Sequence, residues 1–305
     1  MRYAILGAGG IGGLIAAALA SAGDEIILVV RPGTEASYPA TLTVDGPFGR
    51  VTLHARTVAE LRERVDVLWI TVKATQLAAA IEQIPAQVEA TAIVPLLNGI
   101  DHVQLLRDRF GAERVVAATI AVESERVAPG HIVQRSPFAR LRVSERERVL
   151  VEEAMNILRR FGFDTAYVDD EATLLWSKLV FLAPIALSTT AARAPIGDVL
   201  AVDEKREKLE SCVREACAVA LALGARVDAE AVIANIAALP KSMRSSMQKD
   251  QASGRPMELD AIAGPILRGG EHLSIPVAVT AELTRACGGE EWIKLPESAI
   301  PPRAR

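Results

Sequence analysis

The chain has 305 residues, of which 50% are hydrophobic and 24% are charged. This composition is typical of a globular protein and excludes a disordered one, and the length suits about two domains with sizeable cores. The net charge of −4 excludes the basic surface that binds nucleic acid or anionic lipid, so we expect neither a nucleic-acid nor a membrane partner.

The three cysteines, Cys212, Cys217 and Cys287, are odd in number and widely spaced, which argues against a disulfide framework. The sequence has no Cys-x-x-Cys pair and no Cys/His cluster, so no metal site is predicted. We expect buried thiols in a reducing compartment. Because the first predicted strand begins at Tyr3, removal of a leader would destroy the fold, and we expect a cytoplasmic protein.

The first half of the chain alternates apolar runs of strand length with helical stretches. Strands are predicted at 3–6, 25–30, 65–72 and 91–97, and helices at 11–22, 75–84 and 101–110. Strands that alternate with helices predict parallel βαβ units in a doubly wound, Rossmann-type α/β sheet. Further strands are predicted at 115–122 and 131–143, the second at an antiparallel edge.

After about residue 168 the chain has helical periodicity throughout. Helices are predicted at 171–188, 203–223, 229–238, 258–268 and 277–287. The longest apolar stretch, 179–192, is too short to span a bilayer and is predicted to be a buried helix. We therefore expect a Rossmann-type domain over 1–168 and an all-helical domain over 169–305, with a frayed Pro- and Arg-rich end at 300–305. The helix-rich second domain is compatible with a homodimer but does not specify one.

The first predicted strand runs into a glycine-rich turn, GAGGIG at residues 7–12, which fits G-x-G-x-x-G. The pattern is weak alone, but here it follows a strand and opens a helix, which favours a dinucleotide site. Gly7 would allow the tight turn, Gly9 the approach of a pyrophosphate, and Gly12 close packing of helix on sheet. The N–H groups of the helix would face the phosphates. A tight turn without a ligand is the alternative.

The residue after the second predicted strand bears on which dinucleotide is bound. Arg31 stands where an NAD enzyme usually has an acidic residue for the ribose 2′-hydroxyl. A guanidinium there could hold a 2′-phosphate through forked, charge-assisted hydrogen bonds, which predicts NADP(H) as the cofactor. An ordinary solvated arginine is the alternative.

Four further motifs follow the glycine turn in a fixed order. They are TVKATQ at 71–76, LNG at 97–99, LWSKL at 175–179, and SSMQKD at 245–250 leading to Glu258. Each is weak alone, but together they make nearly the whole chain resemble the ketopantoate reductases (2-dehydropantoate 2-reductases). This resemblance implies a Rossmann domain and a helical domain with the active site in the cleft between them. It also implies hydride transfer from NADPH to the ketone of a small 2-oxo acid.

The resemblance assigns roles to five residues. It implies that Lys178 is the general acid, that Asn98 contacts both cofactor and substrate, and that Ser246 binds substrate. Glu258 and Lys73 would lie against the cofactor. Read from the residues alone, reduction of a ketone needs a proton donor and a positive charge near the developing alkoxide, and a lysine supplies both.

Each of these residues has a structural alternative. Lys178, amid leucines, could be a lysine whose stem is buried and whose ammonium reaches solvent. Asn98, before Gly99, could be a turn residue. Lys73 and Ser246 could be surface residues, and Glu258 a carboxylate favoured by a helix dipole.

The sequence departs from the family at the positions that recognise substrate. On a helix, Leu182 and Ala186 share a face with Lys178, and the family usually has asparagines at these two positions. A third family asparagine aligns near Ile196. The predicted substrate is therefore ketopantoate or a more apolar branched 2-oxo acid, with Leu182 and Ala186 against it.

Two other functions stay open. A 3-hydroxyacid or opine dehydrogenase would share the two-domain plan, but the serine-rich segment at 245–247 with Glu258 argues against it. A non-catalytic NADP(H)-binding regulator would keep the cofactor residues alone, and retention of Lys178 and Asn98 argues against that.

Overall fold

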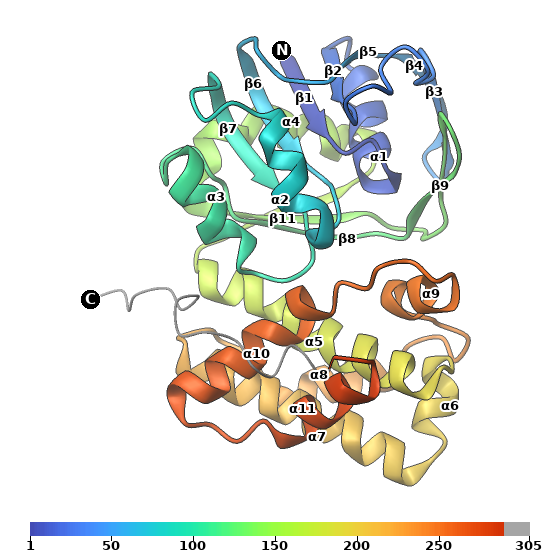
Figure 1. Ribbon diagram of the computed structural model, residues 1–305, viewed down its shortest axis with the longest axis vertical. Helices are drawn as coiled ribbons and strands as arrows, with labels where there is room; N and C mark the ends of the chain where they lie inside the picture. The colour runs from blue at the N-terminus through green and yellow to red at the C-terminus, as the bar shows by residue number, and fades with distance from the viewer. Residues whose placement is uncertain (290–305) are drawn as a thin grey trace. The chain divides into compact units, whose positions relative to one another are not determined.

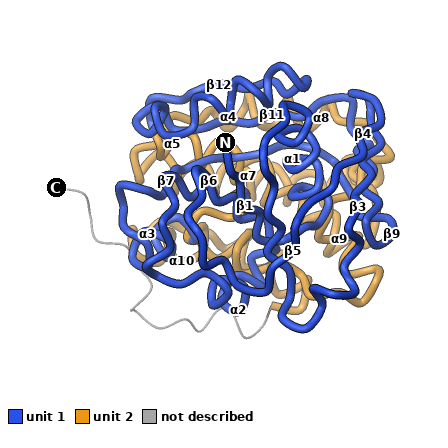
Figure 2. Tube along the Cα trace, turned by 90° about the horizontal axis from the view of Figure 1, so that it is seen from above, with its two compact units in different colours: residues 1–97, 102–170 blue, residues 98–101, 171–305 orange. Residues whose placement is uncertain are grey.

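The computed structural model describes residues 1–289, and the end predicted to fray, 300–305, lies outside them. The chain divides into two compact units (Figure 2). The first contains residues 1–97 and 102–170, and the second contains 98–101 and the chain from 171 onward. Each unit has its own hydrophobic core. The short segment 98–101 thus belongs structurally to the second unit, although it lies between two segments of the first.

The first unit is built on a five-stranded parallel sheet, which confirms the predicted α/β fold (Figure 1). Its strand order is β5-β2-β1-β6-β7. The strands are β1 (Arg2–Leu6), β2 (Glu25–Val29), β5 (Arg56–Val58), β6 (Val65–Ile70) and β7 (Ala90–Pro95). Leu6 is in register with Val29 on one side and Ile70 on the other, so β1, β2 and β6 end together at one edge. In such sheets, ligands bind at the carboxyl ends of the strands.

In the described part of the chain, seven further strands form two smaller sheets. One contains β4 (Gly49–His54), β3 (Thr41–Gly46), β10 (His131–Gln134) and β9 (Ser124–Ala128), and the other β12 (Asp164–Val168), β11 (Arg140–Ser144) and β8 (Ala118–Ala121). The single strand predicted at 131–143 is wrong, because the chain leaves one sheet after Gln134 and enters the other at Arg140. The hairpin of β3 and β4 was not predicted, since only Leu53 of β4 is buried and the strand shows no clear apolar alternation.

The helices of the first unit differ from expectation at two places. They are α1 (Gly10–Ala20), α2 (Leu77–Ala80), α3 (His102–Phe110) and α4 (Arg148–Phe161), with 3-10 turns η1 (Ala74–Gln76), η2 (Ile81–Gln83) and η3 (Glu145–Glu147). The helix predicted at 75–84 is one α-helical turn between two 3-10 turns, and it ends before Pro85. Helix α4 was not predicted, although its buried residues Val151, Ala154, Met155 and Leu158 follow helical spacing.

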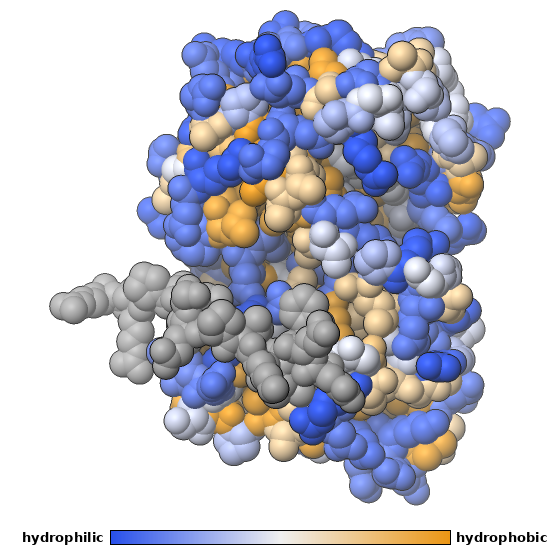
Figure 3. All heavy atoms as spheres, viewed as in Figure 1, coloured by the Kyte–Doolittle hydropathy of each residue, from blue (hydrophilic) through white to orange (hydrophobic). Residues whose placement is uncertain are grey.

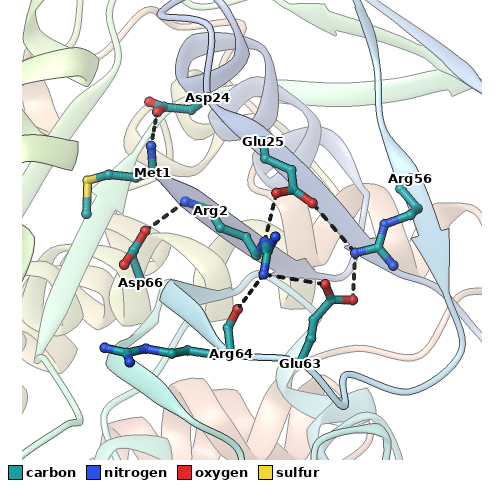
Figure 4. A network of polar contacts seen from close by, with 8 residues as sticks. All are labelled: Met1, Arg2, Asp24, Glu25, Arg56, Glu63, Arg64 and Asp66. Atoms are coloured by element: carbon teal, nitrogen blue, oxygen red, sulfur yellow. Dashed lines mark hydrogen bonds and ion pairs between the residues drawn. The ribbon is translucent and has the colours of Figure 1, made fainter.

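Charged side chains join the amino-terminal ends of the parallel strands (Figure 4). Arg2 donates to Glu25 at 2.7 Å and Arg56 donates to Glu63 at 2.6 Å, while the backbone N–H of Arg2 donates to Asp66 at 2.8 Å. The two arginine–glutamate pairs are largely exposed and contribute little to stability. These contacts tie the amino-terminal ends of the neighbouring strands to one another.

The second unit is helical, as predicted for the chain after residue 168. Its helices are α5 (Glu171–Ala192), α6 (Ile196–Leu200), α7 (Asp203–Ala222), α8 (Ala229–Ala237), α9 (Ser246–Ala252), α10 (Leu259–Leu273) and α11 (Ala278–Ala286). Helix α5 packs against all six others. The helices α6 and α9 were not predicted, because five and seven residues are too few to establish an apolar period.

Helix α5 is long and apolar enough to cross a membrane, but 67% of its apolar window is buried inside the protein. Its burial and its contacts are those of a core helix. The three cysteines are buried, as predicted, and burial raises the pKa of Cys212 to about 12. Over residues 1–289 no group of three His, Cys, Asp or Glu side chains could hold a metal ion. The face drawn in Figure 3 is mostly polar, with apolar residues in separate small groups.

Candidate active site

The glycine turn between β1 and α1 is shaped by contacts that exclude side chains. Gly7 has a φ of +99°, and a Cβ there would lie 2.7 Å from Val72. A Cβ on Gly12 would lie 2.2 Å from the carbonyl oxygen of Gly7. Beside Gly9, in contrast, nothing lies within 4 Å of the Cβ position. The turn is therefore packed against the sheet on one side and open at Gly9, as an approaching phosphate would need.

Side-chain hydrogen bonds fix this turn. Thr71 donates its hydroxyl to the Gly7 carbonyl at 2.7 Å, Tyr38 donates to Ala8 at 3.2 Å, and Ser124 donates to Gly10 at 2.9 Å. Tyr38 and Ser124 lie far from the turn in sequence, and no local pattern marks them. Within residues 1–289, the backbone N–H groups of residues 10–12 have no hydrogen-bond acceptor. These groups are the usual anion-binding donors of a helix start.

Arg31 and Lys73 follow the two strands that flank β1. Arg31 lies two residues after β2 and is exposed, with no carboxylate within ion-pair distance among the described residues. Lys73 lies three residues after β6 and is half-buried. Because β2, β1 and β6 end in register, Arg31, the glycine turn and Lys73 all leave from one edge of the sheet. The structure therefore brings together the residues predicted to bind the cofactor in this unit.

A second group of predicted site residues lies in the helical unit. Asn98 donates its side-chain amide to a carboxylate oxygen of Glu258 at 3.0 Å, across 160 residues of sequence. Glu258 is 6% exposed and precedes α10, but its side chain does not cap that helix. The structural alternative for Glu258, a carboxylate placed for the helix dipole, therefore does not account for its contact with Asn98.

The segment 98–101 packs against α10. Gly99 has a φ of +82°, and a Cβ there would lie 2.3 Å from the carbonyl oxygen of Ala261, so only glycine fits this approach. Arg268 of α10 bonds to Asp101 and donates to Asp260 at 2.7 Å. Sequence reasoning missed Arg268 and its two carboxylates, because the pairing spans 167 residues. The close approach of Gly99 to Ala261 and the ion pair of Arg268 with Asp101 hold Asn98 beside Glu258.

Lys178 on α5 is half-buried, and the charge of Glu258 acts on it within the described part of the chain. Loss of hydration lowers the pKa of Lys178 to about 8, and the carboxylate of Glu258 partly offsets this fall. A lysine in this range is still mostly protonated at neutral pH but releases its proton more readily than an exposed lysine. Proton transfer is most efficient when the pKa lies near the working pH.

The two serines at the start of α9 have different surroundings. Ser245 is buried, accepts from the backbone N–H of Gln248 at 3.1 Å and lies 2.8 Å from the hydroxyl of Thr189 on α5. Ser246, the predicted substrate ligand, is exposed and has no side-chain hydrogen bond among the described residues. Ser245 thus fixes the helix start, and the hydroxyl of Ser246 is available to a ligand.

The apolar positions that replace the expected asparagines are not equivalent. Leu182 is partly exposed on α5, whereas Ala186 and Ile196 have no exposed surface and belong to the second core. Their burial counts against Ala186 and Ile196 as residues that line a substrate pocket. Near them, the hydroxyls of Ser188 and Thr190 are buried and lack hydrogen-bond partners in the described part of the chain.

The family model described as "Ketopantoate reductase PanE/ApbA" matches residues 3–147, and the model of the family's C-terminal part matches residues 170–290. The chain belongs to the ketopantoate reductase family. A 2-dehydropantoate 2-reductase of Caulobacter vibrioides is 32% identical over 91% of this chain and 95% of that protein. The protein is thus an oxidoreductase of the ketopantoate reductase family.

Solved structures agree with this assignment. The 2-dehydropantoate 2-reductase of Geobacter metallireducens is 26% identical and has a TM-score of 0.84, covering 94% of this chain and 99% of that one. A D-mandelate dehydrogenase, solved with NADH and anilino(oxo)acetate, also has a TM-score of 0.84 but is only 19% identical, covering 95% and 98% of the two chains. That likeness shows the fold alone.

Proposed function

We propose that this protein is an NADPH-dependent reductase that converts the ketone of a 2-oxo acid to a hydroxyl. The observation that supports it most is Lys178, an ammonium whose pKa burial lowers to about 8 and on which the buried carboxylate of Glu258 acts. Such a group can both stabilise a developing alkoxide and give it a proton. The resemblance implies this role, and the burial of Lys178 and its lowered pKa support it.

The first unit fits the cofactor. NADPH would supply the hydride when bound. The open side of Gly9 leaves room for the pyrophosphate, and the N–H groups at the start of α1 would donate to it. Arg31, exposed at the end of β2, would hold the 2′-phosphate, and Lys73 would add a positive charge at the same edge.

In the second unit each polar residue has a distinct task. Lys178 would hold the ketone oxygen and transfer its proton to the alkoxide. Asn98 donates to Glu258 and so keeps that carboxylate in place, while Glu258 keeps Lys178 protonated at neutral pH. Ser246, with its exposed hydroxyl, would donate to the substrate carboxylate.

For the substrate we infer an apolar branched 2-oxo acid in preference to ketopantoate itself. Leu182, one turn beyond Lys178, supplies apolar surface but no hydrogen bond for a substrate hydroxyl. The mandelate dehydrogenase complex indicates that a protein of this fold can hold NADH and an aromatic oxo-acid analogue. For this chain, however, the choice of cofactor and substrate rests on Arg31 and Leu182.

A panel of 2-oxo acids, assayed by loss of NADPH absorbance, tests the proposal. We expect turnover with branched apolar members, slower turnover with ketopantoate, and faster reaction with NADPH than with NADH. Turnover of 3-oxo acids alone, or of an amine with a 2-oxo acid, would instead identify a 3-hydroxyacid or opine dehydrogenase. Tight NADPH binding without turnover of any of these compounds would favour a non-catalytic regulator.

A further inference from the structure

A pocket of about 240 Å³ lies in the helical unit, at the C-terminal end of α5 and along α9. Its lining residues are Arg193, Arg244, Gln248, Gln251 and Ala252. We propose that this pocket binds a small molecule through its carboxylate or phosphate oxygens, at a place separate from Lys178. Neither the catalytic proposal nor the family's activity requires this site.

The two arginines have no opposite charge in the described part of the chain. Arg193 and Arg244 are exposed, and no carboxylate of residues 1–289 lies within ion-pair distance of either. Backbone hydrogen bonds hold their segments together, from Ile196 to Met243 at 2.9 Å and from Gly197 to Lys241 at 2.9 Å. Two guanidinium groups facing one pocket repel each other, and a bound oxyanion would remove that repulsion while accepting forked hydrogen bonds.

Gln248 is a second, independent sign of a ligand. Its side chain is 2% exposed and lines the pocket, yet neither its amide nitrogen nor its amide oxygen has a hydrogen-bond partner in the described part of the chain. Burial of an unpaired amide is unfavourable, so such groups are rare in folded proteins. Both amide atoms are covered in this structure, so a rotation of the Gln248 side chain toward the pocket would let the nitrogen donate to an oxyanion and the oxygen accept from a hydroxyl of the same ligand.

The backbone of Arg193 gives a third sign. Its φ is +50°, in the left-handed region. The N–H of Arg193 bonds to Thr190 and that of Ala194 bonds to Thr189, each at 3.2 Å, which is the hydrogen-bond pattern of a glycine-type helix end. Glycine or asparagine would fit this position with less strain than arginine. The position therefore carries a guanidinium despite its backbone conformation, which is expected where the side chain contacts a ligand.

The pocket is separate from the catalytic lysine. Lys178 and Arg193 are 15 positions apart along and just beyond α5, which corresponds to about 22 Å at 1.5 Å per residue. One small 2-oxo acid cannot contact both. The ligand is therefore a second molecule. Because the pocket shares α9 with Ser246, the proposed substrate ligand, the KM measurement below decides between a separate site and an extension of the substrate site.

Calorimetric titration of the full chain with inorganic phosphate and, separately, with citrate tests the proposal, at an ionic strength held constant with chloride. We expect saturable binding of at least one of the two probes, and the preferred probe distinguishes phosphate from carboxylate chemistry. Arg193→Gly should weaken that binding by about 10-fold or more, the effect of losing a charge-assisted hydrogen bond. It should also raise the melting temperature without ligand, because it relieves the left-handed backbone.

Gln248→Leu separates the proposal from a purely structural role. It should raise the melting temperature in anion-free buffer, since an unpaired amide is removed. It should also abolish the further rise in melting temperature that the anion gives the wild type. Arg226→Gln, which removes an exposed charge in the same unit outside the pocket, is the matched control and should bind the probe as the wild type does.

Three results would overturn the proposal. The first is no saturable binding of either probe. The second is that Arg226→Gln weakens anion binding as much as Arg193→Gly does. The third is an anion-dependent rise in melting temperature that persists in Gln248→Leu. If Arg193→Gly instead raises the KM of the 2-oxo acid as much as it weakens the anion, the pocket belongs to the substrate site and the separate site is refuted. None of these measurements except the last depends on turnover, so failure here and failure of the catalytic proposal are distinguishable.

Discussion

The carboxyl edge of the parallel sheet and the group around Lys178 are built in different ways. At the sheet edge, the glycine turn is one short stretch of chain, and its shape follows from backbone conformation and from contacts that exclude a Cβ. Around Lys178, the residues come from three distant parts of the chain: Asn98 donates a hydrogen bond to Glu258, and the charge of Glu258 acts on Lys178.

This difference indicates which substitutions could change the substrate of such a protein while the proposed hydride and proton transfer are kept. A Cβ on Gly7, Gly10 or Gly12 would clash with backbone atoms, so substitution there would alter the proposed cofactor region itself. Substitution of Leu182, a partly exposed side chain one turn from Lys178, would leave the backbone and the proposed proton donor in place. The predictions below test this contrast, from the largest expected effect to the smallest.

Lys178→Ala should reduce turnover of the best 2-oxo acid by at least about 100-fold, because the general acid and the positive charge are both lost. NADPH affinity should change little, since the glycine turn and Arg31 belong to the other unit. Steady-state kinetics and a fluorescence titration with NADPH measure the two quantities. Near-normal turnover would remove Lys178 from the mechanism, and loss of NADPH affinity alone would make it a cofactor ligand.

Arg31→Ala should weaken NADPH binding by about 10- to 150-fold and leave NADH binding nearly unchanged, because only NADPH has the 2′-phosphate. Binding titrations with both cofactors provide the measurement. Arg62→Ala, at another exposed arginine of the same unit, is a suitable control and should affect neither. Equal loss of affinity for NADPH and NADH would show that Arg31 does not recognise the phosphate.

The pH dependence of reduction should follow the protonation of Lys178. In the proposed mechanism the protonated ammonium is the active form. Because burial lowers its pKa to about 8, kcat/KM should be constant below that pH and fall about tenfold per pH unit above it. Oxidation of the hydroxy acid should show the opposite trend, because it needs the neutral amine.

Glu258→Gln sharpens this measurement. The carboxylate of Glu258 raises the pKa of Lys178, so its removal should move the fall in kcat/KM to lower pH. If kcat/KM begins to fall only near the ordinary lysine pKa of about 10.4, in the wild type and in the variant, the role of burial is contradicted.

The sequence predicted the parts of the fold that repeat a local pattern. Four of the five parallel strands and the long helices other than α4 were found from their apolar runs and periods, and the glycine turn was found from its G-x-G-x-x-G spacing. The hairpin of β3 and β4 was missed because one strand buries almost nothing, and the 131–143 segment was misread because its apolar residues continue across a change of sheet.

The candidate site was predictable only where residues follow strand ends or match a motif. Arg31 and Lys73 were placed in this way. Arg268 holds the segment bearing Asn98 against α10. No local sequence pattern marks it, because its partner Asp101 is 167 residues away. Burial of Ala186 was equally hidden, since helical spacing gives the face of a residue but not how tightly that face is packed.

The smallest effect concerns the choice of substrate and depends on Leu182. A ketopantoate hydroxyl placed against Leu182 would leave water without a replacement partner, whereas each buried methylene of an apolar analogue gains about 0.8 kcal/mol. Leu182→Asn should therefore raise kcat/KM for ketopantoate by about 2- to 12-fold, the value of one net hydrogen bond, and lower it for the apolar analogue. Leu182→Met keeps the apolar surface and should leave the order of substrates unchanged.

The same change at Ala186 is a poorer test, because asparagine would overfill a fully buried position at a cost of about 1–3 kcal/mol of stability. A wild-type kcat/KM for ketopantoate above about 10⁵ M⁻¹s⁻¹, with no apolar analogue preferred, would contradict the role of Leu182. Hydroxyls would then have to replace the missing amides, and the buried Ser188 and Thr190 are the candidates, since neither has a hydrogen-bond partner in the described part of the chain. Ser188→Ala and Thr190→Val would in that case lower ketopantoate turnover, while under the apolar-pocket hypothesis both leave the substrate preference as it is.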